Sequence, residues 1–535
     1  MRPDLRLPGR LFIALLASSL LGCAPMAEQP GVDTAEVVVP AGPDIERLED
    51  WVAAETGPTE PVMPVREIDL WDRIRAGYAL EEVESRRIDA QFNWYARHQD
   101  YLDRVATRAT PYMHMIVEEI ERRGMPMEIA LLPVVESAFD PFAYSHGRAA
   151  GLWQFIPGTG KRFGLKQNWW YDGRRDVKEA TRAALDYLEY LHKLFDGDWM
   201  LALAAYNSGE GNVGRAVRRN QRAGKPIDFF SLRLPRETEA YVPKLLALKK
   251  LVATPEQYGI TLQSIADEPF LAAVDTHQQI DLALAAELAG LSVEEVYLLN
   301  PGFNRWATDP DGPHQLLLPL ENAERFEANL AELGERKTVE WRRHMVRSGE
   351  SLGAIANHYK TTVTLLKDVN SIRGHLIRVG DYLMVPVASR SLDQYSLAEQ
   401  NRVSAKQNRA REGVKVKHEV ISGESFWSIS RRYNVGIREL AGWNNMAPGD
   451  PLRAGQVLAV WTDNPPTLPT GGLSSDARMR TVTYTVRRGD SLAKIASRFG
   501  VSVGDIARWN DLNMSNYLQP GQRLRLRVDV TKQST

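Results

Sequence analysis

The sequence predicts a multidomain protein in which an all-α domain precedes several small α+β modules. Apolar residues recur at three- and four-residue spacing from about residue 68 to residue 254, which is the periodicity of amphipathic helices. The C-terminal half contains a unit that occurs three times with the same internal spacing. A chain of 535 residues is also too long for a single hydrophobic core, so several domains are expected.

Residues 1–22 have the composition of an export signal. A basic start is followed by the apolar run LFIALLASSLLG, which is too short to span a bilayer as a helix. The run ends at Cys23, the single cysteine, so no disulfide can form within the chain. The segment LLGC resembles the signal of bacterial lipoproteins, in which the cysteine is lipidated; a free thiol in a plain signal peptide is the alternative.

The lipoprotein resemblance implies a location as well as an anchor. Lipidation of Cys23 would hold the protein in the cell envelope of a Gram-negative bacterium. Ala24 follows the cysteine, and an Asp there would mark retention in the inner membrane, so the outer membrane, facing the periplasm, is expected. Residues 23–67 are rich in Pro, Gly and acidic residues and are expected to form a tether.

The helical domain is expected over residues 68–260, with its core at 105–250. The pattern YMHMIVEEIERRG stops at Gly124, a residue type that commonly ends helices. The pattern DWMLALAAYNSGEG begins with Asp198, which is suited to cap a helix. Nothing in this half alternates with period two over any length, so the domain is predicted to be all-α.

Three stretches of the C-terminal half align through their first parts. They are HMVRSGESLGAIANHYKTTVTLLKDVN, HEVISGESFWSISRRYNVGIRELAGWN and YTVRRGDSLAKIASRFGVSVGDIARWN. In each, a glycine lies 21 positions before an asparagine, at Gly349 and Asn370, Gly423 and Asn444, and Gly489 and Asn510. Each unit is predicted to fold as strand, helix, helix and strand. The modules are expected at residues 343–387, 417–461 and 482–528, with linkers at 388–416 and 462–481.

These units resemble LysM modules, a family that binds N-acetylglucosamine chains, including bacterial peptidoglycan. Peptidoglycan glycan strands are therefore the expected partner. A weaker copy, QIDLALAAELAGLSVEEVYLLNPGF, aligns Asn300 with Asn370 but has Gln279 in place of the glycine. We predict that residues 270–320 form a degenerate LysM-like unit that is more structural than sugar-binding.

Glu136 is a carboxylate within the otherwise apolar stretch ALLPVVESAFDP. Burial disfavours the charged form and raises the pKa of a carboxyl group, an environment that suits a general acid. A solvent-facing Glu at the end of a core helix would give the same pattern. Three further clusters follow along the chain, SHGRAAGLWQF, LAAYNSGEG and RETEAYVPK.

Together with VESAF, these clusters resemble the soluble lytic transglycosylase family in order and spacing, over roughly residues 105 to 250. The resemblance implies a lysozyme-like, goose-type all-α catalytic domain. It implies cleavage of the bond between N-acetylmuramic acid and N-acetylglucosamine without water, which leaves 1,6-anhydro ends. Glu136 would act first as the acid and then as the base.

The same resemblance assigns supporting residues. Ser145 and Gln154 would hydrogen-bond sugar substituents, and Tyr206 and Asn207 would line the wall near Glu136. Glu237 would orient one of these groups from below, although a carboxylate at a helix start is also favoured by the helix dipole alone.

Other functions are disfavoured by composition. A formal net charge of −2 is not that of a nucleic-acid-binding protein. Ten histidines without ligand-like spacing and the absence of a phosphate-binding loop indicate neither a metal nor another cofactor. Two alternatives stay open: a non-catalytic peptidoglycan-binding scaffold lipoprotein, and a lysozyme-like hydrolase in which a second carboxylate such as Asp140 takes part.

Overall fold

The computed structural model describes residues 69–333, 338–463 and 479–529, except 487–489, 500, 502, 511, 513–517 and 520. The predicted signal peptide, Cys23 and the tether lie outside the described residues, as do Gly489 and most of the linker predicted at 462–481. Contacts divide the chain into two compact units. The first ends at Asn408 and also includes Asn444–Asp450, and the second comprises Arg409–Trp443 and the residues from Pro451 onward.

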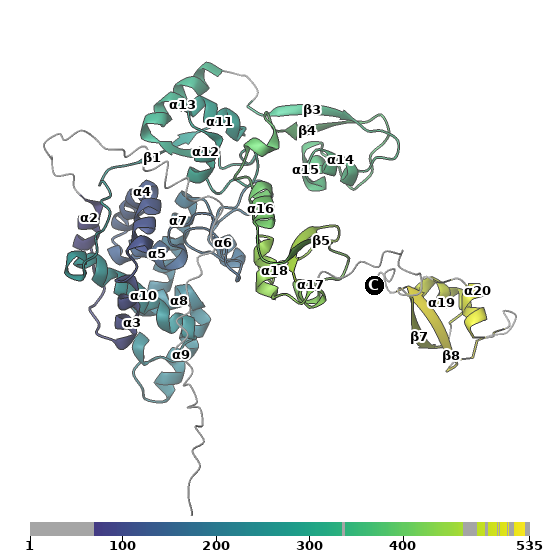
Figure 1. Cartoon of the computed structure of the whole chain (residues 1–535), viewed down its shortest axis with the longest axis horizontal. Helices are drawn as coiled ribbons and strands as arrows, with labels where there is room; N and C mark the ends of the chain where they lie inside the picture. Colours follow the sequence, from purple (N-terminus) through teal and green to yellow (C-terminus); the bar gives the residue numbers. More distant parts are fainter. Residues whose placement is uncertain are drawn as a thin grey trace, which may run out of the picture. The chain divides into compact units, whose positions relative to one another are not determined.

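The first unit begins with the helical domain, which runs from purple to teal in Figure 1. Its α-helices are α2 (Leu70–Ala76), α3 (Arg86–Tyr95), α4 (Gln99–Arg122), α5 (Leu132–Ser137), α6 (Pro157–Arg162), α7 (Val177–Leu194), α8 (Trp199–Ser208), α9 (Glu210–Arg222) and α10 (Arg236–Ala253). Short 3₁₀ helices are η1 (Met127–Leu131), η2 (Phe229–Ser231) and η3 (Pro255–Tyr258). Asp176 and Asp198 accept hydrogen bonds from backbone N–H groups in the first turns of α7 and α8, which fixes where these helices begin.

The core of the helical domain follows from the apolar periodicity of its helices. On α7, Ala184, Leu188 and Leu191 are buried, with the predicted three- and four-residue spacing. On α8, every residue from Leu201 to Ala205 is buried, so this helix is enclosed by its neighbours. Each fully buried leucine contributes about 1.5 to 3 kcal/mol through the hydrophobic effect. The enclosed α8 positions the residues at its C-terminal end.

A small α+β layer follows the helical domain within the first unit. Strands β1 (Leu271–Asp275) and β2 (Gln315–Pro319) pair antiparallel, and α11 (Leu282–Ala289), α12 (Val293–Leu299) and α13 (Leu320–Leu333) complete the layer. The hydroxyl of Tyr112 in α4 donates a hydrogen bond to the carbonyl of Leu298, at 2.9 Å. The N–H of Asp172 donates to the carbonyl of Gly302, at 2.8 Å. The layer is therefore packed on the helical domain.

Residues 388–408, which were expected to be part of a linker, pack against the first unit. They form η4 (Leu392–Gln394) and α16 (Glu399–Asn408). The buried hydroxyl of Tyr395 lies 2.9 and 3.0 Å from the two carboxylate oxygens of Asp281. Arg402 is also buried, with its guanidinium 4.6 Å from the centre of the Phe142 ring. A polar composition usually indicates a solvent-exposed linker. Here several of the polar groups, including the Tyr395 hydroxyl and Arg402, are buried instead.

Three further modules have the predicted order of strand, two helices and strand. The first consists of β3 (Glu340–Met345), α14 (Leu352–His358), α15 (Val363–Val369) and β4 (Tyr382–Val387). The second consists of β5 (Val414–Glu419), α17 (Phe426–Tyr433), α18 (Ile437–Trp443) and β6 (Val457–Thr462). The third consists of β7 (Met479–Thr485), α19 (Leu492–Phe499), α20 (Val503–Trp509) and β8 (Arg523–Asp529). The strands of each module pair antiparallel.

The repeated asparagine has a structural role in these modules. The side-chain amide of Asn370 donates to the carbonyl of Met384 at 2.9 Å and accepts from its N–H at 2.7 Å, which joins the second helix to the second strand. Asn510 makes the same pair of bonds to Arg525, at 2.7 and 2.6 Å. In the α+β layer, Asn300 makes it to Leu317, at 2.9 and 2.8 Å. The alignment of Asn300 with Asn370 is thus confirmed by an identical bonding pattern.

The predicted fold class is confirmed, because an all-α domain precedes small modules that each contain one two-stranded sheet. Within the residues that the structure describes, no helix is both long and apolar enough to cross a membrane.

Candidate active site

Glu136 lies near the end of α5, a helix of six residues that begins with Leu132 and Pro133. The helix ends in two consecutive residues with left-handed backbone conformation, Ala138 (φ 51°) and Phe139 (φ 57°). A bulky residue such as Phe rarely adopts this conformation, and backbone strain of this kind clusters at functional sites. The strain is supported by packing, since Phe139 is fully buried. The chain therefore turns sharply directly after Glu136.

The surroundings of Glu136 bring its pKa into the neutral range. Burial raises the pKa of the Glu136 carboxyl to about 7, and the negative charge of Glu237 acts in the same direction. The hydroxyl of Tyr241 and the positive charge of Lys244 act in the opposite direction. Tyr241 Oη donates a hydrogen bond to Glu136 Oε1 at 2.5 Å. Glu136 Oε2 has no hydrogen-bond partner among the described residues, so it is the oxygen available to a substrate.

Tyr241 is the functional residue that the sequence interpretation missed. It lies four residues after Glu237 on α10, so the two residues face the same side of the helix. The cluster RETEAYVPK contains Tyr241 as well as Glu237, and the sequence alone does not show which of the two contacts Glu136. The structure leaves Glu237 exposed and brings the buried Tyr241 to Glu136 instead. The influence of Glu237 on Glu136 is electrostatic.

Ser145 and Gln154 lie in the loop between α5 and α6. Ser145 Oγ accepts a hydrogen bond from the N–H of Ala149 at 3.0 Å. Gln154 has a left-handed backbone (φ 47°), and its Nε2 donates to the carbonyl of Gly151 at 2.8 Å. Both side chains are half-buried and stabilise the turns of their own loop.

Tyr206 and Asn207 end the enclosed helix α8. The hydroxyl of Tyr206 donates to the carbonyl of Trp153 at 2.8 Å. Burial and the nearby Glu136 carboxylate hold the pKa of Tyr206 well above its usual range, so its hydroxyl stays protonated. Asn207 Oδ1 accepts from the hydroxyl of Thr238 at 2.8 Å, which leaves its amide nitrogen for other partners.

Asp140, the other candidate carboxylate, is influenced by different charged residues from those that influence Glu136. It is buried, and burial raises the pKa of its carboxyl to about 6 against the opposing charges of Arg108, Lys406 and Arg175. Its Oδ1 accepts from the N–H of Phe142 at 2.8 Å. The Asp140 carboxyl is therefore enclosed by the protein, with positive charges acting on it.

No group of His, Cys, Asp and Glu side chains in the described ranges could hold a metal ion.

Three family models match this chain. The Transglycosylase SLT domain matches residues 114–229, and the Lytic transglycosylase MltD, LysM-like domain matches residues 270–335. The LysM domain matches three times, at residues 344–386, 418–461 and 484–527.

Individual proteins are similar over different lengths. The membrane-bound lytic murein transglycosylase D of Escherichia coli strain K12 is 37% identical over 464 residues, which is 86% of each chain. A putative tributyltin chloride resistance protein of Alteromonas sp. strain M-1 is 42% identical over 165 residues, or 30% of this chain and 79% of that one. The solved structure of the 70 kDa soluble lytic transglycosylase of Escherichia coli covers 31% of this chain and 30% of its own, at 21% identity and a TM-score of 0.23.

The helical domain with Glu136 and the LysM modules after it define the class as an SLT-type lytic transglycosylase with LysM modules. The resemblance seen in the VESAF, SHGRAAGLWQF, LAAYNSGEG and RETEAYVPK clusters is confirmed. Within this class, the chain belongs to the family of membrane-bound lytic murein transglycosylase D.

Proposed function

We propose that this protein cleaves the β-1,4 bond between N-acetylmuramic acid and N-acetylglucosamine in peptidoglycan, with Glu136 as the single acid and base. The observation that carries the proposal is a carboxyl group whose pKa burial raises to about 7, so that both protonation states are accessible at neutral pH. Ordinary glycosidases need two carboxylates, and the second candidate, Asp140, is buried away from solvent.

The reaction needs two proton transfers and no water. Protonated Glu136 first donates its proton to the bridging oxygen, and the glycosidic bond breaks with departure of the N-acetylglucosamine hydroxyl. The Glu136 carboxylate then accepts the proton of the muramic 6-hydroxyl, whose oxygen bonds to C1 and closes the 1,6-anhydro ring. Glu136 ends the cycle protonated, as it began.

The neighbours of Glu136 support both steps. Tyr241 stabilises the carboxylate formed in the first step through its bond to Oε1, and Oε2 exchanges the proton with the sugar. We assign Ser145, Gln154 and the Asn207 amide nitrogen to hydrogen bonds with sugar substituents. Tyr206 forms part of the wall, and Glu237 supplies a negative charge that favours the protonated acid.

Product masses and two isosteric variants test this proposal. Digestion of purified peptidoglycan should release muropeptides lighter by one water than hydrolysis products. Glu136→Gln should lower activity by about 10²- to 10⁴-fold or more, because one group serves both steps. Asp140→Asn is the matched control and should keep most of the activity.

Other outcomes would favour the alternatives. Reducing ends in the wild-type digest, together with an equal loss in Asp140→Asn, would indicate a lysozyme-like hydrolase. Wall binding without any released product would indicate a scaffold lipoprotein.

We also propose that lipidated Cys23 anchors the protein to the outer membrane, facing the periplasm, and that the LysM modules hold it on glycan strands. The sequence LLGC followed by Ala24 supports the anchor. Cys23→Ser should move the protein from the outer-membrane fraction to the soluble fraction once the wall has been digested to remove glycan binding. A variant that still sediments with the membrane would contradict the anchor.

A further inference from the structure

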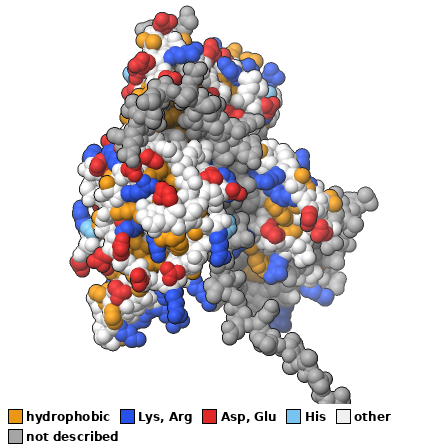
Figure 2. Space-filling view, turned by 60° about the vertical axis from the view of Figure 1, so that its left-hand side comes forward, with side chains coloured by type: hydrophobic (Ala, Val, Ile, Leu, Met, Phe, Trp, Pro, Cys, Tyr) orange, Lys and Arg blue, Asp and Glu red, His pale blue; other side chains and the backbone are white. Residues whose placement is uncertain are grey.

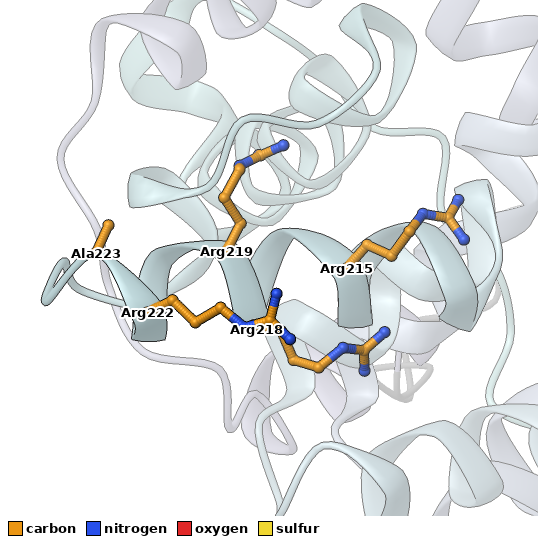
Figure 3. Close-up of a pocket in the computed structure, with 5 residues that line it drawn as sticks. All are labelled: Arg215, Arg218, Arg219, Arg222 and Ala223. Atoms are coloured by element: carbon orange, nitrogen blue, oxygen red, sulfur yellow. The ribbon is translucent and has the colours of Figure 1, made fainter.

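Helix α9 carries a row of four arginines on its surface. Arg215, Arg218, Arg219 and Arg222 follow the three- and four-residue spacing that places side chains on one helix face. All four are exposed, and together with Ala223 they line a recess of about 400 Å³. Figure 3 shows the four side chains extending outward from the helix. In Figure 2, blue Lys and Arg side chains gather at the lower end of the helical domain, the height at which Figure 1 labels α9.

Few groups compensate these charges. No Asp or Glu occurs in residues 211–227. Within the described ranges, Arg218 and Arg222 have neither a hydrogen-bond nor an ion-pair partner. Arg215 donates to the side-chain oxygen of Asn212, and Arg219 donates to the carbonyl of Arg233 at 2.8 Å, but these acceptors are neutral. The row therefore concentrates positive charge in a chain whose formal net charge is −2.

Helix stability does not account for the whole row. The helix dipole favours Arg219 and Arg222 in the last turn. Arg215 lies far from that end. Within each pair at four-residue spacing, Arg215 with Arg219 and Arg218 with Arg222, the like charges destabilise the helix by about 0.2 to 0.5 kcal/mol. A bound anion would remove this repulsion.

The row lies on the helix that follows Tyr206 and Asn207 along the chain. Gly209 alone separates α9 from α8, which carries Tyr206 and Asn207. The first residue of α9 is held in place, because Glu210 accepts hydrogen bonds from Arg162 at 2.9 Å and from Tyr187 at 3.2 Å. At 1.5 Å per residue, the row spans about 10 Å along the helix. The row therefore lies on a helix that packs against the helix carrying Tyr206 and Asn207.

We propose that this arginine row binds the carboxylates of the peptide stems that branch from the muramic residues of the bound strand. The inference rests on the proposed function, because the stems are a part of that substrate. Their carboxylates are ionised at neutral pH, whereas the sugar rings that carry them are neutral. The planar guanidinium group of Arg matches carboxylates through paired hydrogen bonds. Several carboxylates along one strand fit a row of arginines better than one small anion does.

The double variant Arg218→Gln/Arg222→Gln tests the row, since these two side chains make no hydrogen bond or ion pair with the described residues. The substrates are soluble glycan chains with native stems and the same chains with their stem carboxylates converted to amides. On native chains the variant should raise KM by about three- to ten-fold with unchanged kcat. On amidated chains it should equal the wild type. The wild-type KM should rise with salt, and that of the variant should rise less.

The control variant is Arg86→Gln/Arg87→Gln, which makes the same charge change at exposed positions on α3. It should leave KM unchanged on both substrates. An equal loss on native and amidated chains, or no loss on either, would overturn the proposal. Loss of binding to phosphatidylglycerol vesicles with an unchanged KM would also overturn it and would assign the row to a membrane surface.

A binding measurement separates this inference from the catalytic proposal. The full-length Glu136→Gln protein should bind native chains more tightly than amidated ones, and Arg218→Gln/Arg222→Gln should remove that difference. This result would support the binding of stem carboxylates by the arginine row even if the wild type released no anhydro products. If the Glu136→Gln protein binds native and amidated chains equally tightly, the row does not bind stem carboxylates, and the catalytic proposal is unaffected.

Discussion

The hydroxyl of Tyr241 lies 2.5 Å from Oε1 of Glu136, and the two residues come from helices α10 and α5, 105 positions apart. Burial raises the pKa of Glu136, while this hydrogen bond lowers it, and the balance is a value of about 7. Tyr241 thus acts on the residue that carries the proposed chemistry.

Tyr241→Phe should move the alkaline limb of the pH profile of kcat/KM to higher pH, by up to about one unit. Without the donor, the carboxylate is less stable, so the pKa of Glu136 rises and the protonated acid persists to higher pH. Tyr206→Phe is the control, because its hydroxyl bonds to the Trp153 carbonyl instead. A shift of the limb to lower pH would contradict the role of Tyr241.

Glu136→Gln should make the folded protein more resistant to unfolding at pH 8 than the wild type, but not at pH 4. The folded-state pKa of Glu136 is about 7, above the ordinary value of 4.5, so wild-type stability falls as pH rises between these values. Gln does not titrate, and the difference should reach about 3 kcal/mol above pH 7. Thermal unfolding at several pH values measures it. A difference that is independent of pH would contradict the raised pKa.

Tyr395→Phe should destabilise the first unit by about 1 to 3 kcal/mol, because the buried carboxylate of Asp281 loses its hydroxyl partner. Tyr382→Phe, at an exposed position on β4, is the matched control and should have little effect. Hydrogen exchange in α16 measures the local loss. A truncation after Asn408 would keep this contact and would remove only the second and third LysM modules, at residues 418–461 and 484–527. Equal exchange in both variants would contradict the packing of this segment.

Trp427→Ala should weaken sedimentation of the full-length protein with insoluble peptidoglycan by about two- to ten-fold. Its side chain is 62% exposed in the first turn of α17, two residues after the SGES turn of the second LysM module. The first and third modules have Gly353 and Ala493 at the same distance from their glycines, so at this position the second module alone offers an indole on which a sugar ring can stack. Val414→Ala, at another exposed apolar position of the module, is the control. Equal sedimentation of both variants would contradict this role.

Much of the fold was predictable because its signals are local. The spacing of Ala184, Leu188 and Leu191 depends only on helical periodicity. The repeated glycines were equally informative, since Gly349 and Gly423 adopt φ values of 85° and 88°, which L side chains rarely adopt. The apolar run around Glu136 predicted the enclosure that raises its pKa, and the structure leaves the side chain half-buried.

By itself, the sequence determined the order of domains, the repeated modules and the identity of the buried acid. Tertiary structure decided which side chain reaches that acid, because the packing of α10 against α5 brings Tyr241 to Glu136, while Glu237, one turn earlier on the same face, stays exposed. It also decided that residues 388–408 pack, because Asp281, more than 100 residues earlier in the chain, satisfies the hydroxyl of Tyr395. Contacts of this kind depend on how distant segments pack, and no local pattern in the sequence records them.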